Sequence, residues 1–148
     1  MDDARFTDDP ADIDPAVVHA WLTERSYWAR GRTLATQEAA MAGSRCYGVV
    51  GADGRLLAFA RVVTDGVTFG WLADVFVDPA VRGHGIGKVL VQGVVADLAP
   101  LGLKRIALST ADAHGLYEQV GFRALPDPEH WMVLPGPGFG ADVHDDRD

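Results

Sequence analysis

The sequence predicts a single mixed α/β domain, with a mostly antiparallel central sheet and helices on both faces. Its 148 residues suit one compact domain that can bury a core without disulfides or metal. Three apolar runs follow one another and are separated by Asp-Gly pairs, which is typical of consecutive antiparallel hairpins. Helix-like and strand-like segments then alternate, so helices and strands are expected to share one core.

The N-terminal third predicts one short strand, around Phe6, and two helices. Asp14 precedes a proline, and this pair is typical of a helix N-cap and the first helical residue, so a helix is expected over 15–24. A second helix is expected over 34–41, because Thr33 can cap it and a glycine follows its end.

The three apolar runs predict consecutive strands over residues 45–51, 55–64 and 67–77. Each connecting Asp-Gly pair is expected to form a type I′ turn, since glycine accepts positive φ angles. The third run, VTFGWLADVFV, is almost wholly apolar, which favours burial on both faces of the sheet. Pro79 ends it, because proline cannot donate a hydrogen bond to a neighbouring strand.

The second half predicts a helix, a strand and another helix. Apolar residues recur at helical spacing over 86–98, and a proline and a glycine then stop the helix. The run KRIALST predicts a buried strand. Asp112 is a candidate N-cap for a short helix that Gly121 ends. The final expected strands are FRAL and HWMVL.

The net charge of −8 comes from the two ends of the chain. Residues 1–14 hold six acids and residues 140–148 hold four, which leaves the remaining chain formally neutral. We therefore expect one domain over 1–136 and an acidic, flexible tail over 137–148. The absence of a basic patch and of a ~20-residue apolar run predicts neither a nucleic-acid nor a membrane partner.

Two features that the sequence lacks predict the cellular compartment of the protein. The acidic N-terminus lacks the apolar run of a signal peptide, and the single cysteine, Cys46, cannot form an internal disulfide. Because Cys46 lies in an apolar run, we expect a buried structural thiol and a reducing cytoplasm.

Three glycines alternate at the head of the 86–98 helix, between Arg82 and Lys88. A helix N-terminus exposes free N–H groups and the positive end of the helix dipole, which together stabilise a bound phosphate. Glycine lets the backbone turn and approach such a ligand closely. The loop therefore predicts a phosphate-bearing cofactor, whereas a tight turn that binds nothing would need only one glycine.

The spacing of these glycines excludes two common phosphate-binding motifs. A P-loop, G-x-x-x-x-G-K-[ST], would need glycine where the chain has Arg82, and serine or threonine where it has Val89. A Rossmann fingerprint, G-x-G-x-x-G, would place Lys88 or Leu90 at its third glycine. No G-x-S-x-G elbow and no metal-ligand spacing occurs, so neither a serine hydrolase nor a metal cofactor is expected.

Two motifs together resemble the GCN5-related N-acetyltransferase (GNAT) family. The first is Arg-x-x-Gly-x-Gly, filled by Arg82, Gly85 and Gly87. The second, AHGLYEQVGFR at 113–123, is similar to the family's A-x-x-L-Y-x-x-x-G-F signature, with one helix and one strand between the motifs as in the family. The resemblance covers roughly residues 55–125. It implies a GNAT-like fold with a splayed central strand pair, and acetyl-coenzyme A as cosubstrate.

The resemblance also implies which residues would bind acetyl-coenzyme A. In the family, backbone N–H groups of the loop wrap the pyrophosphate, and the end of the third strand pairs with the pantetheine arm. Many members carry an asparagine shortly before the tyrosine motif, where this chain has Thr110 and Asp112. The histidine of the loop is expected to contact phosphate or to face solvent. The expected cofactor-binding residues are Phe76, Val77, Arg82, Gly83, His84, Gly85, Ile86, Gly87, Lys88 and Asp112.

Two residues are expected to be catalytic. The resemblance makes Tyr117 the general acid, since a tyrosine with a pKa of about 10 stays protonated at neutral pH and can hydrogen-bond the leaving sulfur. Asp74 is the candidate general base, because it interrupts an apolar strand and desolvation is expected to raise its pKa. Two alternatives stay open: a structural hydrogen-bonding role for Asp74, or a water chain that replaces it as base.

The segment RSYWARGRT, residues 25–33, is the best indicator of the acceptor, because the loop between the first two helices helps to wall the acceptor pocket in the resembled fold. Tyr27 and Trp28 can contact an apolar or aromatic acceptor, and Arg30 or Arg32 can hold a carboxylate. The alternative is that the aromatic side chains pack on the core and the arginines are solvated.

These features predict an acetyl-coenzyme A-dependent N-acetyltransferase that moves the acetyl group directly to a primary amine of a small molecule or protein. The expected partners are that amine and, in addition, a second copy of the chain as a homodimer. The alternative function is a non-catalytic acyl-coenzyme A sensor, against which Tyr117 argues because a sensor needs no proton donor beside the sulfur. A pure interaction module would need no glycine loop.

Overall fold

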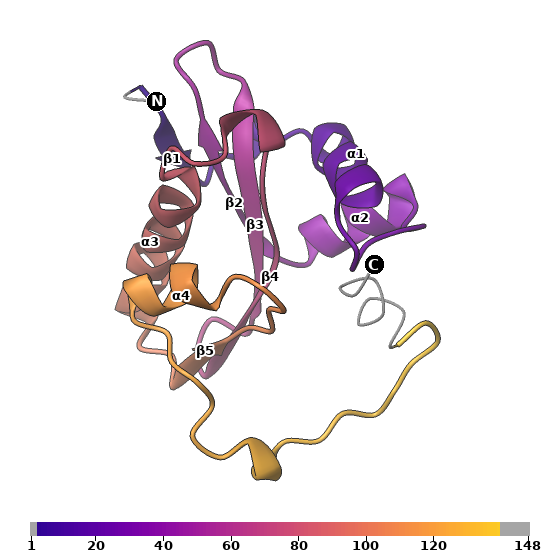
Figure 1. Cartoon of the computed structure of the whole chain (residues 1–148), viewed down its shortest axis with the longest axis vertical. Helices are drawn as coiled ribbons and strands as arrows, with labels where there is room; N and C mark the ends of the chain where they lie inside the picture. The colour runs from indigo at the N-terminus through magenta and orange to yellow at the C-terminus, as the bar shows by residue number, and fades with distance from the viewer. Residues whose placement is uncertain (1–2, 140–148) are drawn as a thin grey trace.

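The structure is a computed structural model that describes residues 3–139. A five-stranded sheet in the order β1-β2-β3-β4-β5 lies between two layers of helices (Figure 1). The first three neighbouring pairs are antiparallel and β4–β5 is parallel, so the predicted mixed, mostly antiparallel α/β fold is confirmed. The strands are β1 (Arg5–Thr7), β2 (Arg45–Val50), β3 (Leu56–Thr64), β4 (Phe69–Val77) and β5 (Arg105–Ala107).

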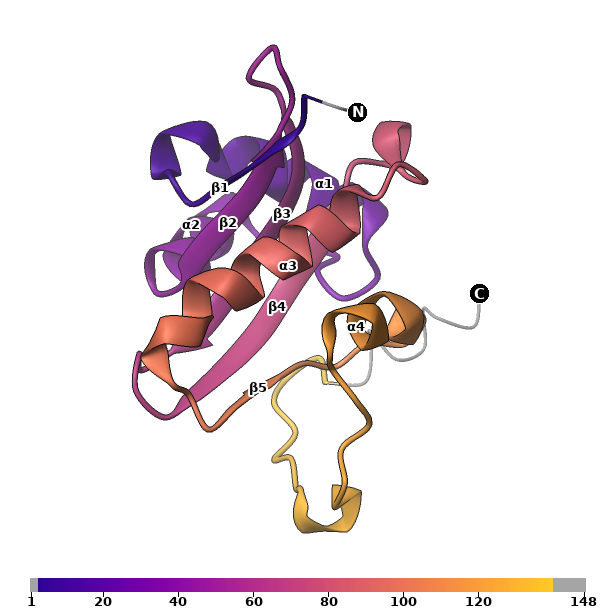
Figure 2. The ribbon, with the colours of Figure 1, turned by 90° about the vertical axis from the view of Figure 1, so that its left-hand side faces the viewer.

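Four α-helices cover the sheet, α1 and α2 on one face and α3 and α4 on the other (Figures 1 and 2). They are α1 (Pro15–Arg25), α2 (Leu34–Ala42), α3 (Ile86–Leu98) and α4 (His114–Val120). Short 3-10 helices lie at Pro10–Asp12, Pro79–Val81, Ala99–Leu101 and Pro128–His130. None of the helices in the described part of the chain combines the length and apolarity needed to span a bilayer.

The predicted N-caps of the first two helices are confirmed. Asp14 accepts a hydrogen bond from the backbone N–H of Ala16 at 2.9 Å, and Thr33 accepts one from Thr36 at 3.1 Å. Each bond satisfies a donor that the first helical turn leaves free. Asp112, in contrast, does not cap α4: Ala113 is the N-cap residue, and its N–H donates to the side chain of Thr110.

The two Asp-Gly pairs do form hairpin turns, but the expected type I′ geometry is wrong. Only the glycines, Gly54 and Gly66, have positive φ, at 80° and 79°, whereas type I′ requires it at both central residues. The aspartates instead accept hydrogen bonds from backbone N–H groups two residues further on, at 3.0 Å for Asp53 and 2.8 Å for Asp65. This side-chain bond holds the turn while aspartate keeps an ordinary φ.

The core consists of one apolar layer on each face of the sheet. Leu90 and Val94 of α3 are fully buried against one face, and Val18 and Leu22 of α1 are fully buried on the side of the other. The expectation that β4 is buried on both faces is wrong, because its burial alternates and Trp71 is 38% exposed. The layer of α1 and α2 therefore does not extend over the first half of β4.

The two final strands expected in FRAL and HWMVL are also absent from the described residues. After α4 the chain leaves the body as an extended arm that contains only the 3-10 helix at Pro128–His130 (Figure 2). We call residues 123–139 the C-terminal arm. Of the expected acidic tail over 137–148, only residues 137–139 are described, and the rest lies outside the described residues.

Candidate active site

A groove opens where β4 and β5 diverge. The two strands pair only from Phe69–Trp71 to Arg105–Ala107, so the second half of β4 has no partner on that side. The expected splay is therefore confirmed, and it leaves backbone N–H and C=O groups of β4 available to a ligand. The groove has a volume of about 420 Å³. The predicted site residues that line it are Tyr27, Trp28, Phe76, Val77, Arg82, Gly83, Gly85, Ile86, Gly87, Asp112 and Tyr117.

A β-bulge at Asp74 determines which way the end of β4 faces. Arg61 pairs with Ala73 and Phe59 with Phe76, so two β4 residues lie opposite a single β3 residue. Asp74 has a φ of 54°, in the left-handed region that non-glycine residues rarely adopt. The extra residue reverses the alternation of β4 beyond this point.

The reversal decides which side chains at the end of β4 face each helix layer. Leu72 before the bulge and Val75 after it both pack in the α3 layer, although they are three residues apart. Phe76 packs in the α1 layer, where its ring lies 5.7 Å from that of Trp21. Without the bulge Phe76 would face α3, so this one residue sets the orientation of the groove wall.

The N-terminus of α3 forms one end of the groove. Its N-cap residue, Gly85, has a left-handed φ of 76° and offers no side chain to the free N–H groups of the first turn. Gly83 is also left-handed, at 86°, so both residues adopt conformations that glycine tolerates best. A Cβ at Gly87 would lie 3.4 Å from Leu116 and 3.5 Å from Val77, inside the groove wall. This arrangement suits an anionic group held by backbone amides.

The charged residues around the loop divide into two groups. The Arg82 Nε donates to the backbone oxygen of Val77 at 3.0 Å, and its guanidinium lies 5.2 Å from the centre of the Phe76 ring. These contacts hold Arg82 along the groove wall. His84 and Lys88 are exposed beside the loop and do not line the groove, so their predicted contacts with a cofactor stay predictions.

Tyr117 lies in the groove wall on α4, 7% exposed. Its ring packs edge-on against Phe122 at 5.8 Å. Burial raises the pKa of Tyr117 to about 12, and the negative charge of Asp112 contributes to the rise. The hydroxyl therefore stays protonated across the neutral range, as a general acid requires.

Asp74 is held by three donors that converge on its carboxylate. Arg32 and Arg61 each donate to Oδ2 at 2.7 Å, and the Trp28 indole donates to Oδ1 at 3.0 Å. Burial acts to raise the pKa of Asp74, but the hydrogen bonds and positive charges of the two arginines outweigh it, so the pKa is lowered. The expected rise in this pKa is therefore wrong, and the geometry favours the structural alternative.

The loop between α1 and α2 forms the wall opposite α4. The rings of Tyr27 and Trp28 meet edge to face at 5.0 Å, and both line the groove. Arg32 does not line it, because its guanidinium bonds to Asp74 and to the side-chain oxygen of Gln37 at 2.8 Å. Arg32 therefore belongs to the hydrogen-bond network around Asp74 and not to the lining of the groove.

Sequence reasoning missed Arg61, the second partner of Asp74. A detectable signal existed, because Arg61 interrupts the apolar strand β3 just as Asp74 interrupts β4, and the two strands form one hairpin. Opposite charges in adjacent buried strands are expected to pair. Ser26 and Leu116 also line the groove and were not predicted as site residues. Serine carries no functional signal by itself, whereas Leu116 is the leucine of the A-x-x-L-Y signature.

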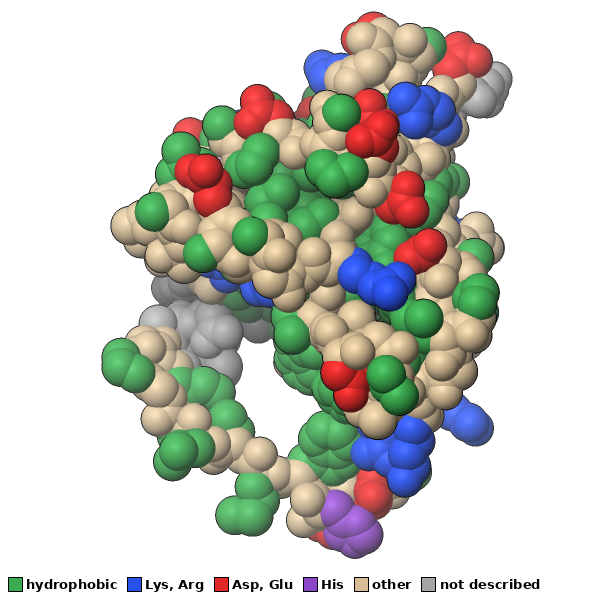
Figure 3. All heavy atoms as spheres, turned by 180° about the vertical axis from the view of Figure 1, so that it is seen from behind, with side chains coloured by type: hydrophobic (Ala, Val, Ile, Leu, Met, Phe, Trp, Pro, Cys, Tyr) green, Lys and Arg blue, Asp and Glu red, His purple; other side chains and the backbone are tan. Residues whose placement is uncertain are grey.

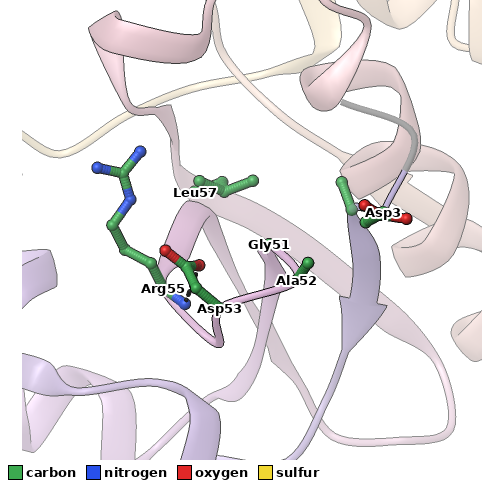
Figure 4. Close-up of a pocket in the computed structure, with 7 residues that line it drawn as sticks. Asp3, Gly51, Ala52, Asp53, Arg55 and Leu57 are labelled. Atoms are coloured by element: carbon green, nitrogen blue, oxygen red, sulfur yellow. Dashed lines mark hydrogen bonds between the residues drawn. The ribbon is translucent and has the colours of Figure 1, made fainter.

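A second hollow, of about 340 Å³, lies at the β2–β3 hairpin (Figure 4) and shares no lining residue with this groove. Its charged side chains are Asp3, Asp53 and Arg55. The Asp53 carboxylate is engaged in its own turn, through the bond from the Arg55 N–H. We assign no function to this hollow. In addition, residues 3–139 contain no group of three or more His, Cys, Asp or Glu side chains placed to hold a metal ion.

Known proteins with similar sequences and structures share this arrangement of elements. The model of the acetyltransferase (GNAT) family matches residues 15–122. A crystal structure from Xanthomonas campestris pv. campestris, of a protein assigned to the GNAT family, has a TM-score of 0.84 and 39% identity, covering 92% of this chain and 95% of that one. A structure from Deinococcus radiodurans R1 shares the fold, with a TM-score of 0.69 at 21% identity, covering 90% and 88%.

A plant protein is similar to the chain over part of its length. Serotonin N-acetyltransferase 2, chloroplastic, of Oryza sativa subsp. japonica is 40% identical over 82 residues, which are 55% of this chain and 41% of that protein. The similarity therefore extends over less than half of that relative.

Proposed function

Since the chain belongs to the GNAT acetyltransferase family, we propose that it is an N-acetyltransferase that moves an acetyl group from acetyl-coenzyme A to a primary amine. One observation carries this proposal. The uncapped N-terminus of α3, the unpaired edge of β4 and the buried hydroxyl-bearing ring of Tyr117 all border one groove. These are the parts needed for a pyrophosphate, a pantetheine arm and a thioester sulfur, respectively.

In the proposed reaction the neutral amine attacks the thioester carbon directly. A C–N bond forms while the C–S bond breaks, and the electron pair of the C–S bond leaves with sulfur. A free backbone N–H of β4 next to Phe76, on the edge that β5 leaves unpaired, is proposed to stabilise the developing charge on the carbonyl oxygen. The proton of the Tyr117 hydroxyl is proposed to pass to the leaving sulfur, and its raised pKa of about 12 keeps that proton in place beforehand.

The attacking amine must also lose a proton, and we assign its removal to water rather than to Asp74. A carboxylate that accepts hydrogen bonds from two guanidinium groups and an indole is a weak base. Its proposed role is to position the groove wall, because Asp74 joins the α1–α2 loop, through Trp28, to the bulge in β4.

The proposed acceptor is an amine with an apolar or aromatic body. Tyr27 and Trp28 supply two aromatic rings at the groove, and Arg32 is bonded to Asp74 and not available to a substrate carboxylate. The partial relative from rice is named a serotonin N-acetyltransferase, which agrees with an aromatic amine. A protein amine stays the second candidate.

Two measurements test this function. Titration calorimetry with coenzyme A tests the binding site, and a thiol-release assay with acetyl-coenzyme A and a panel of aromatic, aliphatic and peptide amines tests transfer. We expect binding and release with at least one aromatic amine. Absence of coenzyme A binding would overturn the proposal. Binding without release for any amine in the panel would instead favour the sensor alternative.

A further inference from the structure

The charged side chains around Asp74 are more deeply buried than charged groups usually are. Most Lys and Arg side chains in view in Figure 3 lie apart from one another at the surface, the usual place for charged groups. In contrast, the Asp74 side chain is only 3% exposed, and the Arg61 and Arg32 side chains that share its carboxylate are 15% and 18% exposed. Replacing such a network with apolar side chains of similar volume often leaves stability unchanged or improves it. Stability alone therefore does not explain this network.

Two further features of the network are unfavourable for stability. Gln37 of α2 is fully buried, and although its Oε1 accepts a hydrogen bond from Arg32, its Nε2 has no partner among residues 3–139. A buried donor without a partner destabilises the fold. Asp74 itself has the left-handed φ of 54°. Backbone strain and unpaired polar groups gather at functional sites, so the network is expected to serve the groove beside it.

Arg61 is connected to the groove although it does not line it. Its Nε donates to Oδ2 of Asp74 at 2.7 Å, and its Nη1 donates to the Ser44 hydroxyl at 3.2 Å, so two partners fix the guanidinium. Oδ1 of Asp74 accepts the hydrogen bond from the Trp28 indole at 3.0 Å. Trp28 lines the groove, whereas Arg61 and Asp74 do not. Two successive hydrogen bonds therefore join β3 to an aromatic ring of the groove wall.

We propose that Arg61 is a positioning residue, which acts through Asp74 to hold the Trp28 ring in the groove wall and so sets the affinity for the acceptor amine. This inference rests on the proposed transfer to an amine and adds to it a residue on β3 that determines specificity. Trp28 lies between α1 and α2, outside any helix or strand, so the bond from its indole N–H and the contact with the Tyr27 ring orient it. A wall that is ordered beforehand loses less entropy when the acceptor binds.

The first experiment separates acceptor binding from chemistry by steady-state kinetics with the amine that the panel identifies. We expect Arg61→Gln to raise the KM for the amine about tenfold, while kcat and the dissociation constant for coenzyme A each change less than about threefold. Arg61→Lys keeps a cation beside Asp74, so its KM should stay within about threefold of the wild-type value. An unchanged KM in Arg61→Gln, or a loss confined to kcat, would overturn the proposal.

Arg45→Gln is the matched control for the loss of an arginine. Arg45 lies on the neighbouring strand β2, but its guanidinium pairs with Asp97 of α3, at 3.6 Å, and it does not line the groove. We expect this variant to keep the wild-type KM. An increase in KM as large as that of Arg61→Gln would show a general effect of losing an arginine from the sheet and would contradict the proposal.

The second experiment tests whether Arg61 acts through Trp28. Trp28→Phe keeps an aromatic ring but removes the indole N–H, so by itself it should raise the KM for the amine about as much as Arg61→Gln does. Adding Arg61→Gln to Trp28→Phe should then raise KM no further, because the connection is already broken. An unchanged KM in Trp28→Phe, or a further increase of about tenfold in the double variant, would refute this route.

The third experiment needs no enzymatic activity. Heteronuclear NMR detects the indole N–H groups of the four tryptophans, and Trp28→Phe identifies the signal of Trp28. We expect this N–H to exchange with solvent about tenfold faster in Arg61→Gln than in the wild type. Unchanged exchange would overturn the positioning role even if an amine is acetylated. Faster exchange in a protein that acetylates no amine would refute the proposed function, while the connection from Arg61 to Trp28 would be supported.

Discussion

The hydroxyl of Tyr117 is the group on which the proposed proton transfer depends. Replacing it in Tyr117→Phe removes the proton donor but keeps the ring that packs on Phe122. We expect turnover to fall about 100-fold, with the dissociation constant for coenzyme A changed less than about threefold. Thiol release and calorimetry measure the two quantities separately.

A control for this variant is Tyr47→Phe, because Tyr47 is buried away from the groove and donates to Asp97 at 2.7 Å. It should alter stability but not turnover. Since the pKa of Tyr117 is about 12, the wild-type rate should also show no loss from this group between about pH 7 and 10. Unchanged turnover in Tyr117→Phe would refute the assigned role.

The Asp74 carboxylate should stabilise the fold in a pH-dependent way. Its pKa is lowered below the unfolded value of about 3.9, so its contribution is complete above that pH and is lost as the pH falls through the folded-state value. In Asp74→Asn two partly buried guanidinium groups lose their partner, and we expect the free energy of unfolding at pH 7 to fall by about 3–5 kcal/mol.

Urea denaturation at pH 7 and near pH 3 measures this contribution, and the variant should be much less sensitive to acid than the wild type. Asp8→Asn is the control, because Asp8 is exposed. A folded Asp74→Asn enzyme should keep the shape of the wild-type pH–rate profile. Loss of one limb of that profile would restore Asp74 as the general base.

Among the elements, the N-terminus of α3 is where one substitution should change helix stability and coenzyme A binding in opposite directions. Alanine at position 87 improves the helix by about 1 kcal/mol relative to glycine but adds a methyl group to the groove wall near Val77 and Leu116. We therefore expect Gly87→Ala to raise the melting temperature and to weaken coenzyme A binding about tenfold.

Gly115→Ala is the matched control, because Gly115 is also in a first helical turn, on α4, and a Cβ there meets nothing within 4 Å. It should gain helix stability with unchanged coenzyme A affinity. Thermal melts and calorimetry distinguish the two variants. If both glycine variants bound coenzyme A as the wild type does, the cofactor would not approach the backbone of α3.

The sequence by itself determined the features that depend on neighbouring residues. Helix caps at Asp14 and Thr33, the hairpins at the Asp-Gly pairs and the glycine loop before α3 were all predictable, because each is decided by hydrogen bonds and φ angles within a few residues. The two family motifs lie on either side of the β4–β5 divergence, so most of the residues that line the groove were predictable as well.

Only the tertiary structure decided what depends on distant partners. The pKa of Asp74 is set by Arg32 and Arg61, 42 and 13 residues away, and these charges reverse the shift that burial would cause. Strand-like sequence in the C-terminal arm forms no strand among residues 3–139, because a strand forms only by pairing with another strand and local propensity does not decide that pairing. Electrostatics and strand pairing act across space, so their outcome depends on which distant segments the fold brings together.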